Sequence, residues 1–188
     1  MQKLLETKSF IFSPTPSIPL ASGKMSRYYV DCKVGLSYPE MRLMIGDLIF
    51  ERIERESIHA VGGLVLGAYP IAIAVSDAAY RSAGRILRAF VVRKEPKPHG
   101  MRKLVEGAVT EGDRVVIVDD VITSGQSTID AIKGSRQEGL EVVRAVAIID
   151  REEQDGRNRI EAEGVPFESL CTLRDLQSLS ESGAHKEK

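Results

Sequence analysis

Two adjacent carboxylates, Asp119 and Asp120, follow an apolar run and precede a short turn that is rich in hydroxyl groups. The turn contains Gly125, and a helical pattern begins after it. Backbone N–H groups at a helix start form a concave site for a phosphate monoester, and glycine lets the backbone approach the ligand closely. The carboxylates suit vicinal sugar hydroxyls or a cationic transition state. We therefore predict a site for a phosphorylated sugar, the alternative being a capped helix behind two solvated aspartates.

A second cluster of residues is cationic. Arg93, Lys94, Lys97 and His99 lie within one stretch of seven residues, directly after a predicted strand. Two prolines and a glycine in and next to this stretch prevent a helix. Cations on a mobile loop can neutralise the charge that grows on a diphosphate leaving group. The alternative is an ordinary solvated basic loop.

Several other classes of site are not supported. The chain has no GxxxxGK[ST] motif and no GxGxxG motif after a strand, so neither a Walker A loop nor a dinucleotide site is expected. Cys32 and Cys171 lie far apart, with no CxxC, CxxH or HExxH spacing, which fits a reducing compartment better than zinc or a disulfide framework. With 26 Lys+Arg against 27 Asp+Glu, the net charge of −1 argues against a dedicated nucleic-acid binder.

The elements that position these residues alternate between strand and helix. Apolar runs predict strands at residues 60–66, 86–92, 114–118, 142–149 and 166–170, and helical spacing predicts helices at 39–53, 70–81 and 126–137 and a short helix after 172. This alternation predicts an α/β domain with a mainly parallel central sheet flanked by helices. Ligands of such sheets bind at the carboxyl ends of the strands, where both clusters fall. His59 is interpreted as a core histidine.

The 188 residues predict a single domain. Residues 1–36 lack a sustained period and form an N-terminal hood region, residues 37–180 form the α/β core, and residues 181–188 form a polar tail. Residues 57–76 carry no formal charge and are long enough to cross a bilayer, but their glycines and proline break the run. We therefore expect a cytoplasmic protein without a membrane segment.

The residues from Val116 to Thr128 resemble the phosphoribosyl diphosphate (PRPP) signature of the type I phosphoribosyltransferases. Together with the basic stretch from Arg93 to Gly100, they make the chain resemble the orotate phosphoribosyltransferases. Agreement extends over roughly residues 18–176, although Ala21 stands where many relatives have a lysine. The resemblance implies the type I fold with a small N-terminal hood.

The implied activity is transfer of the phosphoribosyl group of PRPP to orotate, which gives orotidine 5′-phosphate and diphosphate in pyrimidine (UMP) biosynthesis. The resemblance implies that Lys97, Asp119 and Asp120 are catalytic. It implies that PRPP is bound by Arg93, Lys94, Lys97, His99, Asp119, Asp120, Val121, Ile122, Thr123, Ser124, Gly125, Gln126 and Ser127.

The implied orotate contacts are Thr123 and Arg151. A guanidinium after a strand can hold the carboxylate of orotate with two hydrogen bonds, although Arg151 beside Glu152 and Glu153 would otherwise be interpreted as a surface residue. The resemblance also implies Mg²⁺ held mainly by the substrate diphosphate and water, with no protein metal ligands, and a homodimer with active sites shared across the interface. Two alternatives are a non-catalytic regulator that senses PRPP or a nucleotide, and a phosphoribosyltransferase for another base.

Overall fold

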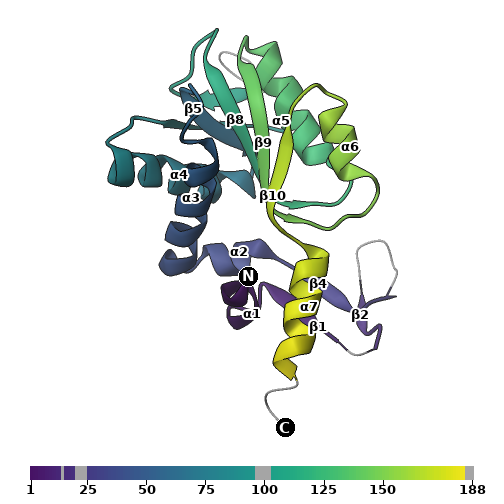
Figure 1. The fold of residues 1–188 in the computed structure, drawn as a ribbon. Helices are drawn as coiled ribbons and strands as arrows, with labels where there is room; N and C mark the ends of the chain where they lie inside the picture. The colour runs from purple at the N-terminus through teal and green to yellow at the C-terminus, as the bar shows by residue number, and fades with distance from the viewer. Residues whose placement is uncertain (14, 20–24, 96–102, 185–188) are drawn as a thin grey trace.

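A central sheet of six strands organises the chain (Figure 1). Its strands are β5 (Ala60–Leu64), β6 (Arg88–Val92), β7 (Val105–Gly107), β8 (Arg114–Ile122), β9 (Glu141–Asp150) and β10 (Phe167–Thr172). The order across the sheet is β10–β9–β8–β5–β6–β7, and every neighbouring pair is parallel except β6 and β7. This computed structural model describes residues 1–13, 15–19, 25–95 and 103–184.

Helices cover both faces of the sheet. Helices α3 (Pro39–Ile53) and α4 (Ala68–Ala83) pack on one face, and α5 (Gln126–Gln137) and α6 (Gly156–Glu161) pack on the other. The side chains of β8 alternate between these layers: Val116 and Val118 join the core with α3 and α4, whereas Val115 and Ile117 join the core with α5. Both faces of β8 are therefore buried, which explains its continuous apolar run.

The strand order reverses direction between β5 and β8. From β5 the chain proceeds outward through β6 to β7, and it then returns to the other side of β5 to form β8, β9 and β10. Such a reversal in a parallel sheet opens a crevice at the carboxyl ends of the two strands that flank it. The topology thus indicates a ligand site formed by the residues that follow β5 and those at the end of β8.

A small lobe lies below the carboxyl ends of the strands in Figure 1. It contains α1 (Gln2–Glu6), β1 (Phe10–Phe12), β2 (Ile18–Pro19), β3 (Met25–Ser26), β4 (Tyr28–Val30) and α2 (Cys32–Leu36). Strands β1 and β4 pair with each other, and the C-terminal helix α7 (Leu173–Ala184) lies against this lobe. Both ends of the described chain therefore contribute to the lobe that faces the crevice.

The predicted α/β class with a mainly parallel sheet is confirmed, and the predicted helix 126–137 coincides with α5. Three expectations are wrong in detail. Strand β8 continues past Val118 to Ile122 because β9 pairs with it up to Asp150. Helix α7 is longer than the short helix expected there. His59 is exposed rather than part of the core. None of the described helices is long and apolar enough to cross a membrane.

Candidate active site

Asp119 and Asp120 lie in the second half of β8, where Asp119 is paired with Ala147 of β9. Consecutive side chains of a strand point to opposite faces of the sheet. The two carboxylates therefore have different surroundings, although their sequence neighbours are the same. The sequence could predict their place at the functional end of the strand but not this division.

Asp119 faces the layer of α5 and is buried, with 6% of the residue exposed. Its Oδ2 accepts a hydrogen bond from Thr128 Oγ1 at 2.8 Å, and its Oδ1 accepts one from the backbone N–H of Asp120 at 2.9 Å. Burial, reinforced by the negative charge of Asp120, raises the pKa of Asp119 to about 7. Near neutral pH this carboxyl group therefore carries a proton part of the time.

Asp120 faces the other layer and is only partly covered. Its Oδ2 lies 3.3 Å from Nζ of Lys33, and its Oδ1 accepts the backbone N–H of Val121 at 3.0 Å. Gly67, at the start of α4, packs directly against it: a Cβ at this position would lie 2.8 Å from Oδ1 of Asp120. A larger residue at this position would therefore displace the Asp120 carboxylate where the β5–α4 connection passes it. The carboxylate lies between β8, α2 and that connection.

The turn before α5 is held in place by α6. Gly125 has a φ of 71°, and a Cβ there would lie 2.8 Å from the carbonyl oxygen of Gly156. Arg159 donates hydrogen bonds to the carbonyl oxygen of Ser124 at 2.6 Å and to Oε1 of Gln126 at 2.7 Å. The first backbone bond of the helix runs from Ile129 N–H to Gly125 O at 2.9 Å. The preceding N–H groups at the helix start can therefore donate hydrogen bonds to a bound anion.

The start of the basic stretch meets this turn across a cavity of about 540 Å³. The cavity is lined by Leu64, Arg93, Lys94, Leu104, Gln126, Ser127, Asp130, Lys133, Gly134 and Gln137. Arg93 is anchored by Glu106 of β7, with 2.8 Å between Nη1 and Oε1. The structure thus brings two of the predicted diphosphate contacts beside the predicted phosphate turn. Lys97 and His99, and also Ala21, lie outside the described residues.

Arg151 follows β9, and its backbone N–H donates to Ile122 O at 2.9 Å. This bond places it at the same edge as Thr123. Its Nη2 lies 3.1 Å from Oε1 of Glu153, but its Nε is buried and has no hydrogen-bond partner among the described residues. An unpaired buried donor is costly, so a carboxylate ligand that reaches Nε would gain a charge-assisted hydrogen bond.

Two residues that position the site escaped sequence reasoning, namely Lys33 and Arg159. Lys33 lies within residues 18–176, over which the resemblance extends, but nothing in its own spacing indicated a partner in β8. Arg159 belongs to a short helix that was not predicted. Among the described residues, no group of three or more His, Cys, Asp or Glu side chains is arranged to hold a metal ion.

Comparison with known proteins agrees with this architecture. Residues 37–167 match the model of the phosphoribosyl transferase domain, so the chain belongs to the phosphoribosyltransferase family. Its branch of that family is the orotate phosphoribosyltransferases. The orotate phosphoribosyltransferase of Aquifex aeolicus is 43% identical over 176 residues, which cover 94% of this chain and 95% of that relative.

Solved structures give the same grouping. The crystal structure of Mycobacterium tuberculosis H37Rv orotate phosphoribosyltransferase with Fe(III) dicitrate superposes with a TM-score of 0.80 at 36% identity, over 93% of this chain and 95% of that one. A second structure of that enzyme contains PRPP and superposes with a TM-score of 0.69 at 36% identity, over 79% of this chain and 82% of that one. The resemblance inferred from the two sequence motifs is therefore confirmed.

Proposed function

We propose that this chain catalyses transfer of the phosphoribosyl group of PRPP to N1 of orotate, which yields orotidine 5′-phosphate and diphosphate in pyrimidine biosynthesis. One observation carries the proposal: the turn before α5, Asp120 and the incompletely paired guanidinium of Arg151 share one edge of the sheet. They match a phosphate, a sugar and a carboxylate-bearing base, respectively. The family of the chain and the names of its relatives support the same reaction.

The chemistry requires no protein nucleophile. Ribosyl transfer passes through an oxocarbenium-like state, as glycoside cleavage does. In our proposal the N–H groups around Gly125 bind the 5-phosphate. Asp120 accepts hydrogen bonds from the sugar hydroxyls and stabilises the positive charge that develops on the ring. Arg151 and Thr123 orient orotate so that N1 faces the anomeric carbon. Catalysis then comes from orientation and charge stabilisation.

The leaving diphosphate meets the basic stretch. Arg93 and Lys94 line the cavity beside Ser127, and Lys97 and His99 are proposed to complete the cover. Mg²⁺ is proposed as the cofactor because diphosphate oxygens and water are the ligands that it prefers. When bound, the ion neutralises charge on the leaving group. Activity that persists unchanged in excess EDTA would contradict this part of the proposal.

The proposal extends to a homodimer. Exposed apolar side chains gather along the outer side of α4, where Tyr69, Ile73 and Tyr80 follow the exposed Leu66. An apolar stripe of this kind fits a second copy of the same chain better than water. Cys32 and Cys171 are free and buried, which supports the proposed location in the reducing cytoplasm.

An absorbance assay tests the reaction. The purified protein is mixed with PRPP, Mg²⁺ and orotate, and parallel samples contain uracil or adenine in place of orotate. We expect loss of orotate absorbance only in the complete mixture. Consumption of another base, or binding of PRPP without turnover of any base, would contradict the proposal.

Mixing two inactive variants tests the shared site. Lys97→Ala and Asp120→Asn subunits are combined and allowed to exchange. If Lys97 acts on the neighbouring subunit, half of the dimers are mixed and each has one intact site, so about 25% of wild-type activity returns. If Lys97 serves its own subunit, every site keeps a lesion and no activity returns after demonstrated exchange.

A further inference from the structure

The small lobe contributes a cation, Lys33, to the carboxyl edge of the sheet. Lys33 is the second residue of α2, which lies on the side of the lobe that faces the sheet in Figure 1. Its Nζ lies 3.3 Å from Oδ2 of Asp120 and 3.5 Å from Oδ1 of Asp31. The same Oδ1 of Asp31 accepts the backbone N–H of Lys33 at 3.0 Å and so caps α2. The base of the lysine is thus fixed, while its ammonium bridges two carboxylates.

The contact selects one oxygen of Asp120. Oδ1 is occupied by the N–H of Val121 and is covered by Gly67, whereas Oδ2 is oriented by Lys33. The side chain of Asp120 is 14% exposed and that of Lys33 is 57% exposed. Lys33 therefore lies on the open side of the carboxylate, where a sugar would arrive.

We propose that Lys33 is a positioning residue for phosphoribosyl transfer, because its ammonium holds Oδ2 of Asp120 and fixes the orientation in which this carboxylate meets the sugar. This inference rests on the proposed role of Asp120. It also assigns the small lobe a direct part in the reaction, because α2 presents the cation to β8.

The charges around Asp120 explain why a cation is needed. Asp119 precedes it on β8, Asp31 at the cap of α2 shares the ammonium of Lys33 with it, and the Gly67 connection adds no charge. Cys32 also approaches, with Sγ 3.9 Å from Asp120 O, but burial keeps its thiol neutral by raising its pKa well above 9.0. Lys33 is the one cation within ion-pair distance of Asp120 among the described residues. In agreement, the charge of Asp120 raises the pKa of Lys33.

Three variants test the role of Lys33. Lys33→Met keeps the length of the side chain and removes the charge, and Lys33→Arg restores a charge. Lys3→Met is the matched control, because Lys3 is similarly exposed and forms a 2.9 Å ion pair with Glu6 far from the sheet edge. The measurements are kcat, the KM for each substrate, and thermal stability.

For Lys33→Met we expect kcat to fall about fivefold, which corresponds to the loss of one partly exposed ion pair at the upper end of its range. The KM for orotate should not change. Lys33→Arg should recover most of the activity, and Lys3→Met should match the wild type.

A Lys33→Met variant with wild-type kcat would overturn the inference. So would a variant that loses activity and thermal stability together, without rescue by arginine, because the contact would then be structural only. In both cases the wild type remains active with orotate. A wild type that does not consume orotate would instead contradict the proposed function, and the role of Lys33 with it.

Discussion

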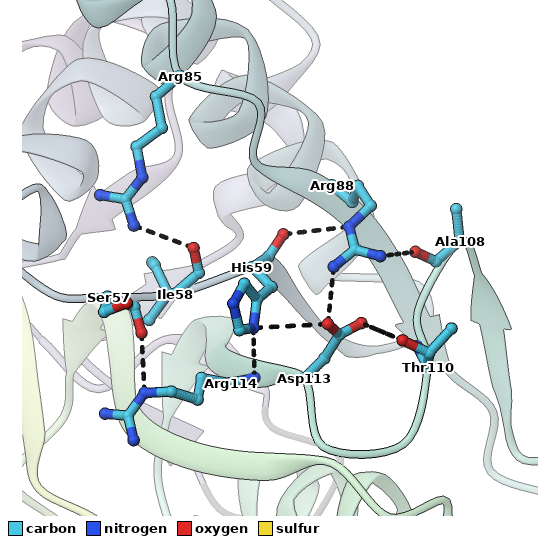
Figure 2. A network of polar contacts seen from close by, with 9 residues as sticks. All are labelled: Ser57, Ile58, His59, Arg85, Arg88, Ala108, Thr110, Asp113 and Arg114. Carbon is cyan, nitrogen blue, oxygen red and sulfur yellow. Dashed lines mark hydrogen bonds and ion pairs between the residues drawn. The ribbon is translucent and has the colours of Figure 1, made fainter.

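The amino and carboxyl ends of the parallel sheet differ in how their charged groups are partnered. At the amino end, Asp113 accepts hydrogen bonds from Arg88 Nη2 and from the Thr110 N–H, both at 2.8 Å (Figure 2). Nη1 of Arg88 also donates to the carbonyl oxygen of Ala108 at 2.7 Å, and the backbone N–H of Arg114 donates to Nδ1 of His59 at 3.0 Å. Each of these groups finds its partner within the protein.

At the carboxyl end of the sheet, some hydrogen-bond donors have no partner among the described residues. Within the described part of the chain, Arg151 has a buried Nε without a partner, and the N–H groups before Ile129 at the start of α5 make no helical bond. Two carboxylates also sit next to each other in the strand. Such arrangements reduce stability but leave groups available for a ligand, which is typical of functional sites.

The pKa values of one carboxylate at each end change in opposite directions. Partial burial acts to raise the pKa of Asp113, but hydrogen bonds from Thr110 and Arg88 outweigh it and hold the pKa below its usual value of 3.8. Burial and the charge of Asp120 instead raise the pKa of Asp119 to about 7. The fold therefore stabilises the ionised form of Asp113 and the neutral form of Asp119.

The largest expected effect of any single change lies at the carboxyl end. Asp120→Asn should leave the fold intact and lower kcat by about 10²–10³-fold, since it removes a charge that opposes the developing cation. Steady-state kinetics and circular dichroism measure the two properties. Asp47→Asn, which alters a surface carboxylate paired with Arg81, serves as the control. Near-normal turnover in Asp120→Asn would mean that this carboxylate is only a feature of the strand end.

A variant of Arg151 tests whether its incompletely paired guanidinium binds orotate. Arg151→Ala should raise the KM for orotate by about 10–100-fold, the range expected for a lost hydrogen bond to a charged group. The KM for PRPP should change much less, so PRPP is the internal control. An equal rise in both constants would place Arg151 outside the base pocket.

The amino end should respond in stability rather than in activity. Asp113→Ala leaves Arg88 and Thr110 without their shared acceptor, and we expect the free energy of unfolding to fall by about 2 kcal/mol at pH 7. Urea titration measures this loss, and kcat should remain at the wild-type value. The pKa of Asp113 is lowered in the folded state, so its contribution is present above the unfolded value of 3.8 and disappears as the pH falls below it. A large loss of kcat with unchanged stability would break the contrast between the two ends.

The sequence could predict the parts of this arrangement that depend on local pattern. The limits of α5 follow from helical spacing, and the carboxylate pair follows from its position after a buried strand. Contacts between positions far apart in the sequence could not be predicted from it. The contact between Lys33 and Asp120, which are 87 positions apart, is an example. Strand β7 has only three residues and pairs antiparallel to β6, so it has too few residues to show a period. That Asp119 and Asp120 point to opposite faces could be predicted only if β8 was known to extend beyond Val118. This extension depends on the pairing of β8 with β9.

The smallest expected effect concerns the pH dependence of stability at Asp119. Because its folded-state pKa is raised from 3.8 to about 7, the folded protein holds a proton in this interval that the unfolded chain has released. The free energy of unfolding of the wild type should therefore fall as the pH rises through the interval and become level above it. Asp119→Asn cannot ionise, and its amide oxygen can still accept the hydrogen bond from Thr128. Between pH 5 and pH 7, we expect the stability of Asp119→Asn to increase relative to that of the wild type by roughly 1–2 kcal/mol. Urea titrations of both proteins at several pH values measure this difference, with Asp47→Asn as the control that should follow the wild type. Parallel curves for Asp119→Asn and the wild type would show that the Asp119 carboxyl is ionised throughout the interval, which would remove the contrast with Asp113 at the other end of the sheet.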